Sequence, residues 1–472
     1  MSGGAPLVAL LVFTAMAVGV LSVKRPGYAA ALVLAAALIV VVATRIEALP
    51  LALVCTIFVE SASLGGLTVG RIAGVLALAV IAYYVLAHGR VSLRFTPLLA
   101  VVGAYGFWIL LSAYWSDTPS AVYSTFFGYV LVIAYMLAFA LLVRSPHDAV
   151  NILVVLVVGA TLSGFVALNT YLVTGGSIRA SGLEGAAHPD TFGVYQAMIA
   201  PVALGLFALA RSAQARLAYL GCMAVIVLSV VSSLTRTAMI SIAVVALIAL
   251  LAPWRVLFRS AAQRATYAVA VAVTAGAVVT VAASATFFAR LGSIFSGGQA
   301  DRAAGRTDLW AAALTAYDRH PWLGIGAGNF QAHSLDLLHQ TQGVDIGAAY
   351  IGQGRPVHNA YLEALTELGP VGLALFVLVI AMTAWYLVRV FRRARAARDD
   401  VTRIVSATLL LGLLGLAVSL GFLSIELNKP LWIIVGLTLA LERMSGERVA
   451  EGARAPDRRP RAREPGAGVA PA

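Results

Sequence analysis

Long runs of apolar residues, separated by short polar or charged segments, cover most of the chain. A run of about 20 residues is long enough for an α-helix to cross the hydrocarbon core of a bilayer. Ending each run at charges, prolines or glycines predicts fourteen spans, at about residues 6–23, 28–44, 49–63, 70–88, 97–115, 120–143, 148–173, 191–211, 216–233, 236–252, 265–288, 364–389, 402–424 and 429–442. Because some early runs are short, about 12 or 13 spans fit the same pattern. The pattern predicts an all-α fold, a polytopic transmembrane helical bundle.

The composition excludes a soluble globular protein. Of the 472 residues, 61% are hydrophobic and 11% are charged, whereas soluble domains are about half apolar and about a quarter charged. The first apolar run has no basic residue before it and Lys24 and Arg25 after it, so we expect an ordinary span rather than a signal peptide. Cys55 and Cys222, the two cysteines, lie within apolar runs. This excludes a disulfide framework and a cysteine-based metal site.

The basic residues predict the orientation of the bundle. The chain has 33 Lys and Arg against 21 Asp and Glu, a formal net charge of +12. In a polytopic membrane protein such an excess indicates cytoplasmic loops rather than nucleic-acid binding. With fourteen spans and a cytoplasmic N-terminus, 22 of the 33 basic residues fall on the cytoplasmic side. Both termini are then cytoplasmic, and one large loop, about 289–357, is extracytoplasmic. We expect residues 1–444 to form the bundle and the Arg- and Pro-rich residues 445–472 to form a disordered tail.

The outer loop has helical and turn patterns of its own. After Arg306, apolar residues recur at helical spacing and predict a short helix on the membrane surface or at the mouth of the bundle. Leu309, Trp310, Ala313, Leu314 and Tyr317 are expected to share one apolar face of this helix. The segment that follows, His320-Pro-Trp-Leu-Gly-Ile-Gly-Ala-Gly-Asn-Phe, predicts a turn, because glycine tolerates a positive φ and the close approach of another backbone. The large outer loop is therefore expected to contain short helices.

Charged side chains gather at the predicted outer ends of the spans. Arg179, Arg236 and Arg306 lie in or beside outer turns, and His358 lies where the long loop re-enters the membrane. Guanidinium groups bind phosphate oxygens bidentately and stay charged at any relevant pH, so arginines at an apolar rim suit a lipid-linked phosphate. Each residue alone also has a simpler interpretation. An isolated arginine serves as an interfacial anchor, and a histidine at a helix start bonds backbone groups.

The spans carry few ionisable groups. Glu60, Glu363 and Glu367 lie near the ends of theirs, whereas ion-coupled transporters usually hold Asp, Glu or His at mid-bilayer depth. No HExxH, DxD or Cys/His cluster is present, and Gly324-x-Gly-x-Gly lies in an outer loop rather than at the start of a βαβ unit. We therefore expect no metal ion and no nucleotide or other cofactor.

Four motifs, in a fixed order, give the chain a family resemblance. They are Arg179-Ala-Ser-Gly followed by His188-Pro-Asp-Thr-Phe-Gly, then Ser-Leu-Thr-Arg236-Thr-Ala, then Arg306-x-x-x-Trp310 followed by the His320-Pro-Trp turn, and finally His358-Asn-Ala-Tyr-Leu-Glu followed by Glu367-Leu-Gly-Pro-Val-Gly. With Tyr114-Trp-Ser-Asp, this set resembles the O-antigen ligase and polymerase superfamily, membrane glycosyltransferases that use polyprenyl-diphosphate-linked glycans. The resemblance runs from about residue 100 to 425 and is densest over 232–375.

The resemblance implies an extracytoplasmic active site that works without a metal ion. By motif, Arg236 and Arg306, together with Arg179, bind the polyprenyl diphosphate. His358 takes the place of the histidine that is essential in the ligases, and with an ordinary pKa near 6.5 it suits a general base for the acceptor hydroxyl. The catalytic residues are then His358, Arg236 and Arg306.

Two further residues are assigned to substrate binding. Asn359 and Glu363 follow His358 within about one helical turn, and one of them is expected to orient the histidine. The chain departs from the family pattern at the Leu-Thr pair before Arg236 and at Asp190, where Asn is commoner. Neither departure removes a charged group from the expected site.

These inferences lead to one expected function and two alternatives. We expect an O-antigen ligase-like glycosyltransferase of the cytoplasmic (inner) membrane that moves a glycan from a polyprenyl diphosphate to a hydroxyl of a lipid or glycan acceptor. Its partners are then the lipid-linked donor, the acceptor and membrane lipids. A repeat-unit polymerase shares the chemistry and differs in acceptor; the single large outer loop favours the ligase. A polysaccharide exporter or flippase, from another class, needs a charged path across the bilayer that the sequence lacks.

Overall fold

The computed structural model describes residues 45–61, 63–64, 67–88, 95–176, 178–184, 189–281, 305–341 and 354–454. The predicted spans at 6–23 and 28–44 lie outside these residues. The same is true of His188 and of residues 455–472 in the predicted tail.

The described residues are mostly helical, as the apolar runs predict. The main helices are α3 (Leu49–Ile57), α4 (Val69–His88), α5 (Pro97–Leu111), α6 (Pro119–Leu142), α7 (Pro146–Val173), α8 (Pro189–Leu209), α9 (Ala213–Ser232), α10 (Arg236–Leu251), α12 (Ala261–Val281), α14 (Arg306–Arg319), α15 (Asn329–His339), α16 (Ala360–Ala396), α17 (Asp400–Leu420) and α18 (Lys429–Arg454). The short elements are η1 (Ile46–Ala48), η2 (Ser112–Tyr114), η3 (Gly182–Glu184), α11 (Trp254–Leu257) and the antiparallel pair β1 (Ser63–Leu64) and β2 (Leu67–Thr68).

Eight of the described helices are long and apolar enough to cross a membrane, namely α4, α5, α6, α7, α8, α9, α16 and α17. The segment of η1 and α3 and the helix α10 are apolar but shorter. This confirms the predicted all-α polytopic bundle and identifies an integral membrane protein. The exact number of spans stays a prediction.

Two boundaries differ from the sequence prediction. The span predicted at 49–63 ends at Ile57, where the chain turns into the β1–β2 hairpin. At this turn Glu60 forms an ion pair with Lys429 at the start of α18, so a charge near the end of a span is neutralised by a neighbour. At the other end of the chain, α18 continues to Arg454, past the predicted end of the bundle at residue 444.

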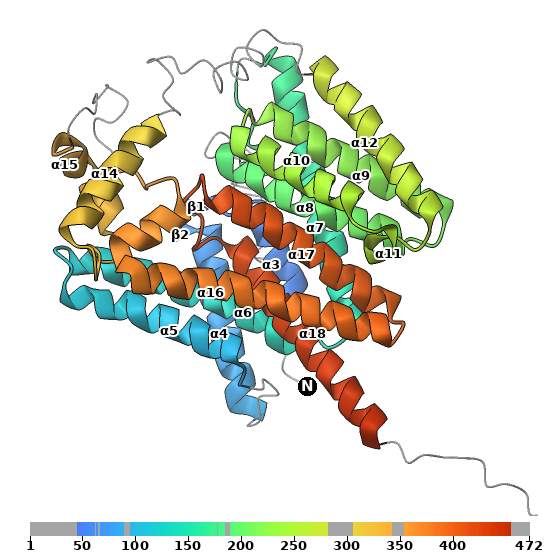
Figure 1. Ribbon diagram of the computed structural model, residues 1–472, viewed down its shortest axis with the longest axis horizontal. Coiled ribbons are helices and arrows are strands. Elements are labelled where there is room, and N and C mark those ends of the chain that lie inside the picture. Colours follow the sequence, from blue (N-terminus) through green and yellow to red (C-terminus); the bar gives the residue numbers. More distant parts are fainter. Residues whose placement is uncertain are drawn as a thin grey trace, which may run out of the picture.

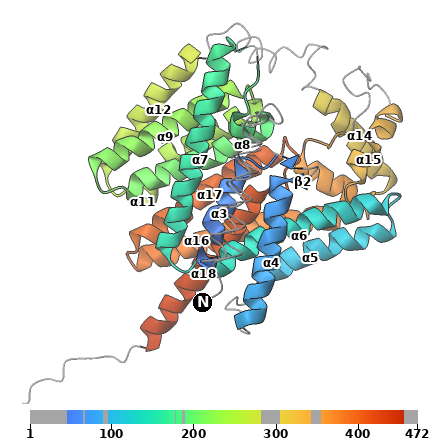
Figure 2. The same ribbon diagram turned by 180° about the vertical axis from the view of Figure 1, so that it is seen from behind.

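Helix α8 lies at the centre of the bundle, packed against α7, α9, α10 and α17 (Figure 1). Of its apolar stretch, 94% is buried. The helices α4, α5, α6, α16 and α18 form a second group whose members pack against one another, and α16 and α18 join this group to α17. Helices α14 and α15 lie at the end of the bundle that is opposite to the free end of α18 in both ribbon views (Figure 2).

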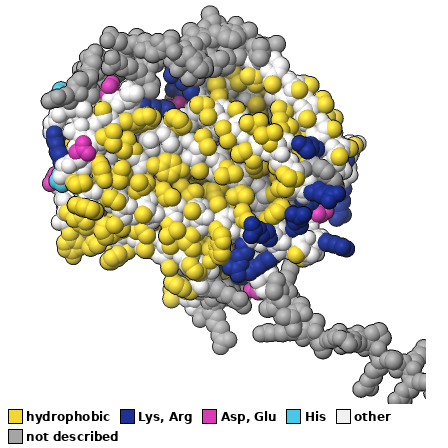
Figure 3. All heavy atoms as spheres, viewed as in Figure 1, with side chains coloured by type: hydrophobic (Ala, Val, Ile, Leu, Met, Phe, Trp, Pro, Cys, Tyr) yellow, Lys and Arg dark blue, Asp and Glu magenta, His cyan; other side chains and the backbone are white. Residues whose placement is uncertain are grey.

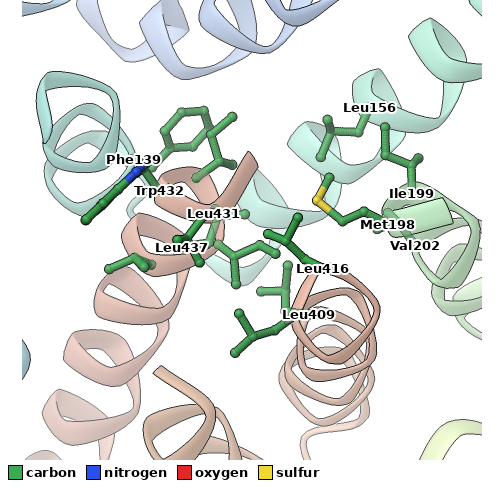
Figure 4. Close-up of a cluster of buried hydrophobic side chains, with 14 of the residues drawn as sticks. Phe139, Leu156, Met198, Ile199, Val202, Leu409, Leu416, Leu431, Trp432 and Leu437 are labelled. Atoms are coloured by element: carbon green, nitrogen blue, oxygen red, sulfur yellow. The ribbon is translucent and has the colours of Figure 1, made fainter. Parts of the chain in front are cut away.

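Aromatic and aliphatic side chains from five helices fill the middle of the bundle (Figure 4). They include Phe139 of α6, Leu156 of α7, Met198 of α8, Leu409 of α17 and Trp432 of α18, none of which is more than 5% exposed. Lipid tails are as apolar as these side chains, so close van der Waals packing, rather than escape from water, stabilises this core.

Hydrogen bonds between hydroxyl groups join helices inside the apolar core. The Ser241 and Ser419 hydroxyls lie 2.8 Å apart and link α10 to α17. The Thr56 and Tyr135 hydroxyls, also 2.8 Å apart, link α3 to α6. Interhelical bonds of this kind contribute about 0.6 kcal/mol each in membrane proteins, so they fix helix register more than they add stability.

The face of the molecule seen in Figure 3 carries a broad apolar area, with Lys and Arg side chains gathered along one edge. At one end of the bundle, Arg389 and Arg393 of α16 pair with Glu442 of α18. At the same end, the guanidinium of Arg403 in α17 donates to backbone carbonyls of α11. The basic ends of α16, α17 and α18 therefore lie together, far from α14 and α15.

Candidate active site

The described part of the loop predicted at 289–357, residues 305–341 and 354–357, contains the helices α14 and α15, as the expectation of short helices in this loop requires. Leu309, Ala312, Ala313 and Ala316 are buried against α15 and α16. Leu309 and Ala313 of the predicted apolar face lie in this contact, whereas Leu314 of that face is 48% exposed. The small alanine side chains let α14 lie close to α16, and that close contact, rather than side-chain size, selects the buried face.

The glycine-rich turn between α14 and α15 rests on a kink in α16. Gly369 of α16 has a φ of 67° and Gly324 of the turn has a φ of 70°, as the sequence predicts for the turn glycines. Pro370 has no N–H to donate to the carbonyl of Thr366. That carbonyl instead accepts from the Ile325 N–H at 3.0 Å. The kink therefore supplies the backbone acceptors to which the turn binds.

Glu367 joins the same kink to the start of α15. Its side chain is 6% exposed, and its two oxygens accept from the N–H groups of Gly328 at 2.7 Å and Phe330 at 3.0 Å. A carboxylate at a helix N-terminus satisfies orphan N–H groups and interacts favourably with the helix dipole. This acidic side chain at the end of a span is thus used to anchor α15.

The polar segment between α5 and α6 holds the other side of the turn. The Asn329 amide donates to the Ser116 hydroxyl at 2.7 Å and accepts from the Thr118 N–H at 3.1 Å. The Trp115 indole donates to the Leu323 carbonyl at 3.0 Å. The Tyr114-Trp-Ser-Asp segment seen in the sequence is therefore part of the scaffold that positions α14 and α15.

Asp190, the second residue of α8, draws two of the predicted site arginines together. Its Oδ1 forms an ion pair with Arg179 Nη2, and its Oδ2 lies 3.4 Å from Arg306 Nη2. Arg179 Nε also donates to the Ser233 carbonyl at 3.0 Å, and Thr235 Oγ1 donates to Asp190 Oδ1 at 3.2 Å. Residues from three separate segments of the sequence thus meet at one point.

Arg236 lies close enough to Arg306 for the two positive charges to interact. Arg236 is the first residue of α10 and lies two positions after Leu234, whose φ is 51°. Burial lowers the pKa of Arg306 below its ordinary value; Asp190 opposes this, and the positive charges of Arg179 and Arg236 lower it further. We name Arg179, Arg236 and Arg306 the arginine cluster. The three arginines that the motifs single out therefore share one electrostatic environment.

His358 lies beside the arginine cluster in a strained conformation. Its φ is 58°, a left-handed value that costs about 1–2 kcal/mol for a residue with a side chain. Its Nδ1 is buried and has no hydrogen-bond partner among the described residues. Burial, with the nearby charges of Arg306 and Arg355, lowers the pKa of His358 to about 4, against a smaller opposite effect of Asp190. The imidazole is therefore neutral at pH 7, as a proton acceptor must be.

Asn359 and Glu363 make contacts that position the backbone around His358. The Asn359 side chain accepts from the N–H groups of Tyr361 and Leu362, both at 3.1 Å, and so caps α16. The carboxylate of Glu363 accepts from the Val357 N–H at 3.2 Å and from the Ser424 hydroxyl. These hydrogen bonds give Asn359 and Glu363 a structural role in the loop before α16. Their direct contact with substrate stays a prediction.

Three residues of this region were given no role by the sequence. Asp190 entered only as a departure from a family pattern, and Thr235 and Arg355 were assigned no function. A signal for Asp190 was present, since an acidic residue that begins an otherwise apolar span requires a nearby positive charge. The described residues hold no group of three His, Cys, Asp or Glu side chains able to bind a metal ion, and the expectation of metal-free chemistry stays a prediction.

Comparison with known proteins identifies the family of this region. Residues 221–377 match the family model described as O-antigen ligase. The matched range contains Arg236, Arg306 and His358 and covers the part of the chain in which the motifs are densest, so the resemblance to the O-antigen ligase and polymerase superfamily is confirmed. No curated protein matches the chain.

Proposed function

Since the chain carries an O-antigen ligase family region, we propose that it is a membrane glycosyltransferase that moves a glycan from a polyprenyl diphosphate to an acceptor hydroxyl at the outer face of the cytoplasmic membrane. The single observation that carries this proposal is the meeting of Arg179, Arg236, Arg306 and a neutral His358 at one end of the bundle. Cationic forks suit the leaving diphosphate, and an unprotonated imidazole suits the attacking hydroxyl.

The arginine cluster supplies transition-state stabilisation. When the bond between the sugar and the diphosphate breaks, negative charge develops on the diphosphate oxygen. Arginines that are already positioned bind this charge more strongly in the transition state than in the bound donor, which is the condition for acceleration. Arg306 is held by its place at the start of α14 and by Asp190, so little reorganisation is needed during the reaction.

His358 removes the proton of the acceptor hydroxyl as that oxygen attacks the anomeric carbon. A pKa of about 4 makes the free imidazole a weak base. A bound diphosphate brings negative charge close to the ring, and negative charge raises the pKa of a histidine. Donor binding therefore strengthens the base at the moment when it is needed.

The pH dependence of the rate tests this coupling. Because the pKa of free His358 is lowered to about 4, the proton-accepting form is present above that pH, and we expect kcat/KM to fall only as the pH drops toward 4. The acid limb of kcat, which reports the donor complex, is expected at a higher pH. Both profiles are measured with a lipid-linked oligosaccharide and purified protein. Coincident acid limbs for kcat and kcat/KM would contradict the coupling.

An apolar groove beside the arginine cluster suits the lipid part of the donor. It has a volume of about 460 Å³ and lies between α8, α9, α10 and α12. Met239, one turn after Arg236 in α10, lines it together with Leu204, Val227 and Val271. A diphosphate bound at Arg236 therefore has an apolar path directly beside it for the first prenyl units.

Filling this groove is expected to weaken binding of long-chain donors. Ala246→Phe places a ring among the lining residues of α10. Displacing about two buried methylene groups of the prenyl chain raises the KM for the donor about tenfold, with kcat little changed. The measurement compares a long-chain donor with a short, soluble prenyl analogue, whose KM changes less. Ala79→Phe, at an exposed position of α4, is the matched control. An unchanged KM in Ala246→Phe removes the groove from the donor site.

The distribution of basic residues supports the proposed orientation. Arg389, Arg393 and Arg403 lie at one end of the bundle with α11 and α18. Lys and Arg favour the cytoplasmic side of a membrane protein. The opposite end, with α14, α15 and the arginine cluster, is then extracytoplasmic, where lipid-linked glycans are joined to envelope acceptors.

One reconstituted reaction tests the function. Purified protein in proteoliposomes is incubated with a polyprenyl-diphosphate oligosaccharide and either a lipid acceptor or a second donor molecule, and the products are identified by mass spectrometry. Attachment to the lipid indicates a ligase, and elongation indicates a repeat-unit polymerase. A donor that stays intact under all conditions, or crosses a vesicle membrane without reacting, overturns the proposal in favour of no transfer or of export.

A further inference from the structure

Asp190 occupies binding positions that an anionic ligand of the arginine cluster would use. One carboxylate oxygen is paired with Arg179 and the other lies 3.4 Å from Arg306. The side chain is 27% exposed and that of Arg306 is 18% exposed, so the group lies at the edge of the site rather than in its interior. Phosphate and carboxylate oxygens bind the same face of a guanidinium fork. A bound diphosphate must therefore share both arginines with Asp190.

The carboxylate is held in place by the segment that precedes α10. Thr235 Oγ1 lies 3.2 Å from Asp190 Oδ1 and 3.2 Å from Arg179 Nη2, and it also lies 3.1 Å from the Pro189 carbonyl. Arg179 Nε donates to the Ser233 carbonyl at 3.0 Å. With contacts on both oxygens and on its neighbours, Asp190 is expected to keep its position when a ligand arrives.

The charge of the ligand changes during the proposed reaction. The donor is a diphosphate diester with two ionised oxygens. As the acceptor oxygen bonds to the anomeric carbon, the sugar–diphosphate bond breaks, its electron pair stays on the diphosphate oxygen, and the acceptor proton goes to His358. The released polyprenyl diphosphate is a monoester with a third ionisable oxygen. A cluster of arginines alone would therefore bind the product more tightly than the donor and would slow turnover.

We propose that Asp190 is a positioning residue that also acts as a fixed anionic competitor, and that it lowers the affinity of the arginine cluster for the released diphosphate more than for the donor. The negative charge of Asp190 repels both ligands. It repels the released diphosphate, which has a third ionisable oxygen, more strongly than the donor, which has two ionised oxygens. This inference rests on the proposed function of the arginine cluster.

The test measures binding of two probes to the full-length protein in detergent or nanodiscs. Farnesyl diphosphate stands for the product, and farnesyl-diphospho-N-acetylglucosamine stands for the donor. For wild type, the two dissociation constants are expected to lie within about threefold of each other, because Asp190 offsets the extra charge. For Asp190→Asn, farnesyl diphosphate is expected to bind about tenfold more tightly, with a smaller gain for the diester. In the transfer assay this variant shows stronger inhibition by farnesyl diphosphate.

Two controls accompany this measurement, a variant that loses the same charge elsewhere and the comparison of both probes on wild type. Asp318→Asn removes the same charge from an exposed position near the far end of α14, and its binding constants are expected to equal those of wild type. Equal or weaker binding of farnesyl diphosphate by Asp190→Asn overturns the inference. If Asp190→Asn does not fold, wild type alone decides, because a preference for farnesyl diphosphate of tenfold or more overturns it as well. If wild type binds neither probe, the arginine cluster is not a diphosphate site, and the proposed function fails with the inference.

Discussion

Replacing His358 with alanine is expected to lower glycan transfer by about 10²–10⁴-fold, the range that a general base contributes. The expectation follows from the neutral, half-buried imidazole, whose buried Nδ1 has no hydrogen-bond partner among the described residues. The expected loss appears in kcat, with the KM for the donor changed little, because the arginine cluster and the apolar groove are unaffected. The measurement is steady-state transfer by purified protein with a lipid-linked oligosaccharide.

A second substitution at the same position distinguishes the role of the imidazole as a base from the role of the backbone conformation. His358→Asn keeps a residue type that adopts left-handed φ values with little penalty, so the loop before α16 is expected to keep its conformation at a φ of 58°. It removes the proton acceptor. His339→Ala, at an exposed histidine at the end of α15, controls for loss of a histidine elsewhere in the outer helices. Wild-type transfer by His358→Asn would show that the strained backbone matters and the imidazole does not.

Changing Arg306 to lysine is expected to lower transfer by about 10–100-fold, and changing it to alanine by about 10²–10³-fold. Lysine keeps the positive charge but loses the fork that bonds two phosphate oxygens at once. The Arg306 side chain is 18% exposed, and its Nη2 lies 3.4 Å from Asp190 Oδ2. A lysine ammonium at this position has no planar fork, so it does not reproduce the contacts of the guanidinium. Both kcat and the KM for the donor are measured, since the guanidinium acts on the bound donor and on the leaving diphosphate.

The same helix provides the control for Arg306. Arg319 is the last residue of α14, is exposed, and hydrogen-bonds Gln340. Arg319→Ala therefore removes one positive charge from α14 without touching the arginine cluster, and it is expected to transfer glycan at the wild-type rate. If Arg306→Lys and Arg319→Ala both equal wild type, bidentate binding at position 306 has no part in the reaction.

The kink of α16 holds α15 and the turn that precedes it. The carbonyl of Thr366 and the carboxylate of Glu367 bind the turn and the start of α15. A few residues earlier in the same helix, Glu363 and Asn359 hold the backbone on either side of His358. One helix thus positions both His358 and the scaffold that carries Arg306.

The sequence by itself determined the membrane character, the all-α class, the short helices in the outer loop and the positive φ of the turn glycines. These features depend on local properties, namely apolar run length, helical spacing and the backbone preferences of glycine. It also selected Arg179, Arg236, Arg306 and His358 by motif, without any information on their distances.

Only the tertiary structure decided how these residues meet. Arg306 is separated from Asp190 by 116 positions in the chain, and no periodicity or composition connects two charges at that separation. The buried face of α14, the backbone contacts of Glu363 and the left-handed conformation of His358 likewise depend on what packs against them. Charge pairing and close packing act over a few ångströms in space, so they follow from the assembled bundle and not from the order of residues along it.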